Sequence, residues 1–204
     1  MKLAEIYSFE KYQTDKGTDH SYIEVYDELL APYQNKQINF LEIGCLAGES
    51  LRLFNDYFEN ANIFGIDNWT TIMNFDGNLL NLAQVPEKFK KEYPEINLVT
   101  CNSIDHYDVN LKIKNTFDVI IDDGDHTLDG QFATFTNFIP KLNKGGIYII
   151  EDVANYNIPT LISKIQSHVT KYSINGFDSI EVRELYKNDR WDDVLFVIRH
   201  NPEE

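Results

Sequence analysis

The sequence predicts an α/β fold built on a doubly wound, mostly parallel, seven-stranded sheet. Short apolar runs alternate with segments whose apolar residues recur at the helical period, a pattern typical of chains that build parallel sheets. Seven such runs are present. The last two are joined by Tyr186 to Asp193, a connection too short for a helical crossover, so they are expected to pair as an antiparallel C-terminal hairpin.

The predicted strands are apolar runs rich in isoleucine, valine, leucine and phenylalanine. In chain order they are Ile38–Ile43, Asn62–Ile66, Ile96–Cys101, Phe117–Ile121, Ile147–Ile150, Ser179–Leu185 and Val194–Arg199. Five alternating units followed by a hairpin result from this order, which places one reversed strand near an edge of the sheet.

Amphipathic helices are predicted where apolar residues repeat every three or four positions. One precedes the first strand (Tyr22, Val25, Tyr26, Leu29, Leu30), one follows it (Leu51, Phe54, Phe58), and one follows the fourth strand (Phe132, Phe135, Phe138, Ile139). The stretch from Trp69 to Pro94 is less regular, because Asp76-Gly77 and Pro86 interrupt it, and is expected to be a loop followed by a short helix.

A single domain is expected over residues 1–204. The chain is 43% hydrophobic, enough for a core with helices on both faces of a sheet, and no repeat or linker divides it. Residues 1–35 are predicted to form a helical or lid segment, and residues 36–204 the Rossmann-like core. Cys45 and Cys101 lie in apolar surroundings and are expected to be buried small hydrophobes, not a disulfide.

The net charge narrows the classes of partner. Thirty-three acidic and 18 basic side chains give a formal charge of −15, which repels nucleic-acid phosphates and anionic membranes. No run approaches the roughly 20 apolar residues that span a bilayer, and the start of the chain is charged and aromatic, so a cytoplasmic location is expected.

Residues at the carboxyl ends of the strands are ligand-binding candidates, because open α/β sheets bind ligands there. The first strand ends in a turn from Glu42 to Gly48, where Gly44 and Gly48 would let a ligand approach the backbone. Asp67 ends the second strand, where a carboxylate can accept both ribose hydroxyls of a nucleoside, and Trp69 could flank its adenine ring. The turn lacks the G-x-G-x-x-G spacing, so it suits a nucleoside without pyrophosphate. Glycines also occur in such turns because of backbone geometry alone, and an acidic residue after a strand is often a solvated loop carboxylate.

Five carboxylates and one histidine follow the fourth and fifth strands. They are Asp122, Asp123, Asp125, His126, Glu151 and Asp152. Crowded like charge is destabilising unless a cation or many hydrogen bonds compensate it. Oxygen ligands favour Mg²⁺, Mn²⁺ or Ca²⁺ over zinc. The alternative is an ordinary Asp-Asp-Gly turn beside a surface histidine, which leaves the second pair of acids unexplained.

The turn Glu42-x-Gly44-x-x-x-Gly48, together with Asp67 and the strand order, resembles class I S-adenosylmethionine-dependent methyltransferases. At Asp122-Asp123-Gly124-Asp125-His126 and Glu151-Asp152, the resemblance narrows to the metal-dependent sugar O-methyltransferases of macrolide biosynthesis, the mycinamicin and tylosin type. The segment from Lys11 to Tyr22, with its Thr-Asp-Lys-Gly stretch, is also similar to that family. These matches run from about Lys11 to Val153.

The resemblance implies a role for each matching residue. Asp123, Glu151 and Asp152 would be metal ligands and His126 the general base. Glu42, Gly44, Gly48 and Asp67 would serve the cofactor, Asp122 would support the strand end beside it, and Lys16 would close over the cofactor or substrate. The family often has Ser at the position of Asp125, and its larger members carry a further N-terminal domain, so the acceptor and the oligomer contacts are not implied.

The implied chemistry is O-methylation with S-adenosylmethionine and Mg²⁺ or Mn²⁺. A sugar hydroxyl is a poor nucleophile until a metal lowers its pKa and a histidine accepts its proton. The expected partner is a small hydroxylated acceptor, a sugar in the first instance, and self-association stays open. Two alternatives remain, a catechol-type phenol O-methyltransferase and a non-catalytic cofactor-binding protein. A nicotinamide-dependent oxidoreductase is disfavoured by the missing glycine pattern.

Overall fold

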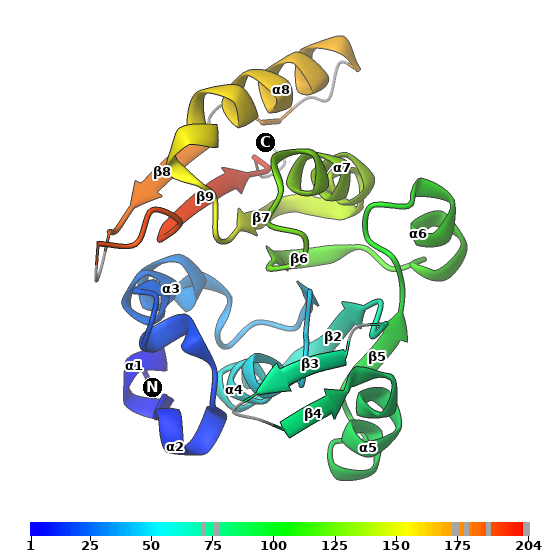
Figure 1. The fold of residues 1–204 in the computed structure, drawn as a ribbon. Coiled ribbons are helices and arrows are strands. Elements are labelled where there is room, and N and C mark those ends of the chain that lie inside the picture. The colour runs from blue at the N-terminus through cyan, green and yellow to red at the C-terminus, as the bar shows by residue number, and fades with distance from the viewer. Residues whose placement is uncertain (71, 76–77, 173–175, 178–179, 187–188, 202–204) are drawn as a thin grey trace.

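A seven-stranded sheet in the order β5-β2-β1-β6-β7-β9-β8 forms the centre of the protein in a computed structural model (Figure 1). The structure describes residues 1–70, 72–75, 78–172, 176–177, 180–186 and 189–201, with the backbone alone for 72–75 and 78–80. The strands are β1 (Ile38–Ile43), β2 (Ala61–Asp67), β5 (Asn97–Thr100), β6 (Phe117–Asp122), β7 (Leu142–Ile150), β8 (Ile180–Glu184) and β9 (Val194–Arg199). The predicted doubly wound α/β fold is confirmed.

The pairing of the strands follows the prediction. Strands β5, β2, β1, β6 and β7 pair in parallel, whereas β9 runs antiparallel to both β7 and β8. Strand β7 begins at Leu142, before the predicted start at Ile147, and its register against β6 shifts in this stretch. Gly145 and Gly146 precede the apolar run in the sequence, so the prediction began after them. The strand tolerates them because its hydrogen-bonding register with β6 is irregular there.

Helices cover both faces of the sheet (Figure 1). They are α1 (Leu3–Ile6), α2 (Phe9–Tyr12), α3 (Tyr22–Leu30), α4 (Glu49–Tyr57), α5 (Val85–Glu92), α6 (His106–Lys112), α7 (Leu128–Phe138) and α8 (Ile158–Lys171). Helices α1 to α5 share one hydrophobic core with alternate strand residues such as Phe40. Helices α6 to α8 share the other core with the intervening residues such as Leu41. Because successive strand residues point to opposite faces of the sheet, each central strand contributes side chains to both cores.

The segment from Trp69 to Pro94 differs from its prediction. Strands β3 (Ile72–Phe75) and β4 (Asn78–Asn81) pair antiparallel where a loop was predicted, while the predicted short helix is present as α5. Asp76-Gly77, the interruption on which that prediction relied, lies outside the described residues. Pro86 stands in the first turn of α5, where a missing amide costs nothing, so it begins a helix and does not break one.

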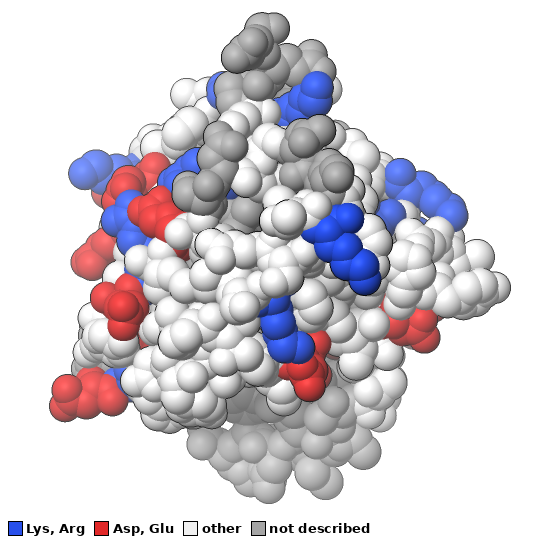
Figure 2. Space-filling model, turned by 90° about the horizontal axis from the view of Figure 1, so that it is seen from above, with Lys and Arg blue, Asp and Glu red and all other residues white. Residues whose placement is uncertain are grey.

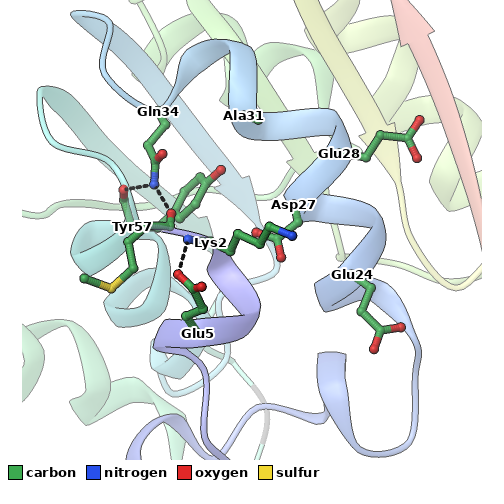
Figure 3. A pocket seen from close by; sticks show the side chains of 9 residues that line it. Lys2, Glu5, Glu24, Asp27, Glu28, Ala31, Gln34 and Tyr57 are labelled. Atoms are coloured by element: carbon green, nitrogen blue, oxygen red, sulfur yellow. Dashed lines mark hydrogen bonds between the residues drawn. The ribbon is translucent and has the colours of Figure 1, made fainter.

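The N-terminal segment lies against α3 and α4, and residues of all three line a cavity of about 520 Å³ (Figure 3). Asp27 on α3 accepts the backbone amides of Leu3 and Ala4, and so fixes the start of α1. Farther along, the 3-10 turn Asp15–Gly17 carries Lys16 towards the edge of the sheet. The predicted helical segment is therefore docked on the core.

Cys45 and Cys101 are buried and unbridged. No helix in the described parts of the chain has the length and apolarity needed to cross a bilayer. On the face drawn in Figure 2, the described lysines and arginines are dispersed, and several of them lie next to acidic side chains.

Candidate active site

The carboxyl ends of the parallel strands meet at one edge of the sheet, and backbone hydrogen bonds continue beyond the strands there. The amide of Gly44 donates to Ile66 at 2.8 Å, and the amide of Asp123 donates to Ile43 at 2.9 Å. The amide of Glu151 donates to the backbone carbonyl of Asp122 at 2.9 Å. The predicted site residues that follow β1, β6 and β7 are thus held in register with one another.

A cavity of about 400 Å³ opens at this edge, a size typical of small-molecule sites. Of the predicted cofactor residues, Gly44 and Asp67 line it. The other lining residues are Ile43, Leu46, Ile66, Asn68, Leu82, Cys101, Asn102, Ser103, Ile104, Gly124 and Asp125. Sequence reasoning missed Asn102 to Ile104, although they follow the predicted third strand and so could have been placed at the same edge.

Asp67 faces this cavity and also fixes the turn beside it. Its Oδ2 accepts the amide of Leu46 at 2.9 Å and its Oδ1 accepts the amide of Trp69 at 2.8 Å. Trp69 is only 3% exposed and does not line the cavity. Its Nε1 donates to the carbonyl of Leu46 at 2.9 Å. The tryptophan therefore supports the turn from within the core.

Gly44 and Gly48 both have a φ of +87°, a conformation that favours glycine. A Cβ on Gly44 would lie 2.0 Å from the carbonyl oxygen of Asp123. A Cβ on Gly48 would lie 2.3 Å from the ring of Phe89. Gly44 therefore allows the cofactor turn to contact the carboxylate cluster, whereas Gly48 allows α4 and α5 to pack.

Glu42 and Asp122 are buried behind the cavity and do not line it. Glu42 Oε2 accepts Ser50 Oγ at 2.7 Å, and Asp122 Oδ2 accepts the hydroxyl of Tyr148 at 3.0 Å. The second oxygen of each carboxyl has no hydrogen-bond partner within the described residues. Burial raises the pKa of each to about 7.

The ammonium of Lys16 is surrounded by three carboxylates. It donates to Asp123 Oδ2 at 2.6 Å and to the two oxygens of Glu151 at 2.8 and 2.7 Å, and it lies 3.6 Å from Glu42 Oε1. Burial opposes its charge, but the three carboxylates outweigh that effect and hold the pKa of Lys16 well above its usual range. Lys16 does not line the cavity at Gly44 and Asp67, and its role in closing over the cofactor or substrate stays a prediction.

Two tyrosines of α3 complete the inner contacts of the cluster. The hydroxyl of Tyr26 donates to Glu151 Oε1 at 2.5 Å, and that of Tyr22 donates to Asp152 Oδ1 at 2.7 Å. His20 stacks on Tyr22 with ring centroids 4.7 Å apart, and its Nδ1 lies 3.5 Å from Asp152 Oδ1. The N-terminal segment thus contacts both acids that follow β7.

His126 lies between two carboxylates at the outer side of the cluster. Its Nε2 is 3.3 Å from Asp123 Oδ1, and its Nδ1 is 3.3 Å from Asp152 Oδ2. Burial favours the neutral ring, but Asp123 and then Asp152 outweigh it and raise the pKa of His126 to about 9. The side chain is 46% exposed, so a ligand can reach it.

The acidic residues offer two sets of metal ligands that share Asp123. The inner set, Glu42, Asp123 and Glu151, already surrounds the ammonium of Lys16. The outer set, Asp123, His126 and Asp152, faces solvent more openly. Lys16 contributes one positive charge to a set of three carboxyl groups, two of them buried, and burial and the charge of Asp123 raise the pKa of Glu151. A hard divalent cation fits this oxygen-rich, undercompensated cluster.

Comparison with known proteins identifies the family of the chain. The model of a family described as "Methyltransferase domain" matches residues 41–153. One similar protein is the 8-demethyl-8-alpha-L-rhamnosyl tetracenomycin-C 2'-O-methyltransferase of Streptomyces olivaceus, 24% identical over 70% of this chain and 36% of its own length. Another is the mycinamicin VI 2''-O-methyltransferase of Micromonospora griseorubida, 29% identical over 70% of this chain and 34% of its own length.

A solved structure shares the fold across nearly the whole chain. The MycE methyltransferase of the mycinamycin pathway, solved in complex with Mg and SAH, superposes with a TM-score of 0.71 at 21% identity. The match covers 99% of this chain and 55% of that one. The chain spans about a third of the length of the two curated relatives. The antiparallel C-terminal hairpin belongs to this shared fold.

Proposed function

The chain belongs to the methyltransferase domain family, within the class I S-adenosylmethionine-dependent methyltransferases, and on that premise we propose that it methylates a hydroxyl of a sugar-bearing small molecule with the help of a divalent metal. The observation that carries the proposal is the position of His126 between Asp123 and Asp152. These three groups unite a candidate base with two candidate metal ligands.

The 400 Å³ cavity is the proposed cofactor site. S-adenosylmethionine, when bound, supplies an electrophilic methyl group. Asp67 is placed to accept the ribose hydroxyls, because its carboxylate already ends β2 at the cavity wall. Asn102 and Ser103 line the same cavity and offer polar groups for the purine. The fit is supported by the cavity lining, which joins the carboxylate of Asp67 to the backbone of Gly44 and to the polar residues Asn102 and Ser103.

The proposed metal ligands are Asp123, Asp152 and Glu151. A divalent cation, when bound, lowers the pKa of the acceptor hydroxyl. Asp123 and Asp152 present oxygens on the open side, next to His126. Glu151 is engaged by Lys16 and Tyr26 and would have to share an oxygen with the ion. The carboxylate oxygens favour Mg²⁺ or Mn²⁺.

His126 is the proposed general base, and its surroundings explain why the metal matters to it. A base must be neutral before it can accept a proton, but a pKa of about 9 keeps the ring protonated at neutral pH. A cation bound to Asp123 and Asp152 would neutralise the two negative charges that raise the pKa of His126. Metal binding would then lower the pKa of the acceptor hydroxyl and leave His126 neutral, so that the ring can accept a proton.

The acceptor class is proposed from the named relatives. One curated relative is named for 2'-O-methylation of a rhamnosyl tetracenomycin, and the other for 2''-O-methylation of mycinamicin VI. The site supports a neutral acceptor, because its acidic cluster would repel an anion. A glycoside with a free hydroxyl beside His126 meets both conditions.

The test is a pair of variants that separate binding from chemistry. We expect His126→Asn to abolish methyl transfer to a glycoside while the dissociation constant for S-adenosylmethionine, measured by calorimetry, changes less than about twofold. Asp67→Asn should weaken cofactor binding by about 10- to 100-fold, the loss of a hydrogen bond to a charged group. Equal loss of cofactor binding in both variants would contradict these roles. Tight cofactor binding without turnover on any hydroxylated acceptor would favour the non-catalytic alternative.

A further inference from the structure

Two exposed aromatic side chains stack on each other at the rim of the candidate site. Tyr156 is 70% exposed and Trp191 is 52% exposed. Their ring centroids are 5.6 Å apart and their planes differ by 23°. Among the described exposed aromatic residues, this is the pair that forms a ring contact with each other. Exposed apolar surface of this kind marks interaction sites.

The backbone ties this pair to the carboxylate cluster. Tyr156 lies in the 3-10 turn Asn155–Asn157, which follows Asp152, and the amide of Asn155 donates to the carbonyl of Trp191 at 2.9 Å. On the other loop, the carbonyl of Asp192 accepts the hydroxyl of Tyr22 at 3.2 Å. That hydroxyl also donates to Asp152 at 2.7 Å. The aromatic pair is therefore fixed in relation to Asp152, beside which His126 lies.

The charges around the pair favour a neutral ligand. Arg190, the neighbouring cation, is engaged by Asp192 through two contacts of 3.0 and 2.9 Å. Its pKa is raised by Asp192 first, and Asp152 and Asp19 add to this effect. Because the charge of Arg190 is compensated by Asp192, the described part of the rim offers aromatic surface beside a neutral ion pair. An apolar, uncharged group suits such surface.

We propose that Tyr156 and Trp191 form an acceptor subsite that holds the apolar aglycone of a glycoside while its sugar hydroxyl meets His126. The inference rests on the proposed function, because it names the part of the acceptor that lies outside the reacting centre. Binding energy gained on such a remote group stabilises the bound substrate and the transition state equally, and so lowers KM without changing kcat. The pair would thus determine specificity and would take no part in the proton transfer.

Trp191 provides a direct readout of this subsite. The protein has two tryptophans, and Trp69 is buried, so a ligand that stacks on the surface perturbs the emission of Trp191 alone. Phenyl and methyl α-L-rhamnoside are suitable probes, since they share the sugar and differ in the aglycone. We expect the phenyl glycoside to shift the emission saturably and to bind at least tenfold more tightly than the methyl glycoside. This titration needs neither cofactor nor metal.

Three variants test the assignment. Tyr156→Ala and Trp191→Ala should each remove the preference for the phenyl glycoside and raise its KM about tenfold, with kcat and cofactor affinity unchanged. Tyr107→Ala is the matched control, because Tyr107 is 76% exposed on α6 and outside the rim. It should leave all these values unchanged.

The outcomes separate this subsite from the proposed function. Saturable binding at Trp191 without methyl transfer would overturn the function and support the subsite. Methyl transfer with the same KM in Tyr156→Ala, Trp191→Ala and the unmodified protein would overturn the subsite and leave the function intact. If sedimentation shows that Trp191→Ala dissociates a dimer, the pair is a contact between copies of the chain and the subsite proposal is wrong.

Discussion

The ammonium of Lys16 lies 2.7 and 2.8 Å from the two carboxylate oxygens of Glu151, and both side chains are 1% exposed. The two residues are 135 positions apart, so this ion pair joins the N-terminal segment to the carboxyl end of β7. A buried pair of this kind adds little net stability relative to an apolar pair, but breaking it leaves a buried charge without compensation. The stability of the carboxylate cluster therefore depends on a neighbouring cation, and in this structure that cation is Lys16.

Lys16→Met should destabilise the protein strongly. The variant keeps the volume of the side chain but removes the cation from Asp123 and Glu151, and a buried pair broken in this way costs about 3–5 kcal/mol of unfolding free energy. Lys11→Met is the matched control, because Lys11 pairs with Asp56 at 2.8 Å on an exposed surface. That pair is worth at most about 1 kcal/mol. Denaturant unfolding in chelator measures both, and similar losses would contradict the buried role of Lys16.

Mg²⁺ should stabilise Lys16→Met more than the unmodified protein. In both proteins a ligand that binds only the folded state raises the melting temperature. Without the ammonium, the three carboxylates of Glu42, Asp123 and Glu151 attract a divalent ion more strongly and accept it without displacing Lys16. Calorimetric melting curves at several Mg²⁺ concentrations measure the increment. A smaller increment in the variant would mean that Lys16 organises the metal ligands and does not compete with the ion.

The titration of His126 should respond to metal. In chelator its pKa is expected near 9, raised by Asp123 and Asp152, and Mg²⁺ should lower it by engaging those carboxylates. Because the folded pKa exceeds the unfolded value of about 6.5, the stabilisation from protonated His126 is complete below about pH 6.5 and disappears as the pH rises through 9.

Two measurements check this expectation. NMR titration of the imidazole carbon-bound protons gives the pKa with and without Mg²⁺. The difference in unfolding free energy between the unmodified protein and His126→Asn, followed from pH 6 to 10 in chelator, isolates the histidine from the acidic groups nearby. A pKa near 6.5 with and without Mg²⁺ would show that Asp123 and Asp152 do not raise the pKa of His126.

The sheet and the strand-end residues could be predicted from sequence because each depends on local pattern. Strands β1 and β9 match their predicted bounds, since an apolar run bounded by polar residues leaves little choice of length. Asp67 and Asp123 could be placed because parallel strands end at one edge. The hairpin of β3 and β4 could not, because its short strands lie in a segment without clear alternation.

The contacts of Lys16 and Trp69 show the limit of that reasoning. A motif places Lys16 near the site but does not say which atoms it meets, because that depends on how α1 and α2 pack on α4 and how the turn Asp15–Gly17 packs on α3. Trp69 directly follows a cofactor residue in sequence, yet a φ of +45° and a hydrogen bond to Leu46 accompany its burial in the core. Side-chain direction after a strand is a tertiary property, and so the sequence alone does not determine it.

Gly44→Ala and Gly48→Ala should have unequal costs although both residues have the same φ of +87°. Each substitution carries the left-handed strain of about 1–2 kcal/mol. At Gly48 the new methyl meets the ring of Phe89, a side chain that can turn away. At Gly44 it meets the backbone carbonyl of Asp123, which cannot move without displacing the carboxylate cluster, so a loss above about 4 kcal/mol is expected. Denaturant unfolding compares the two variants, and calorimetric Mn²⁺ titration should show weakened metal binding in Gly44→Ala alone. Equal losses, or normal metal binding in Gly44→Ala, would contradict the close packing of the cofactor turn on the carboxylate cluster.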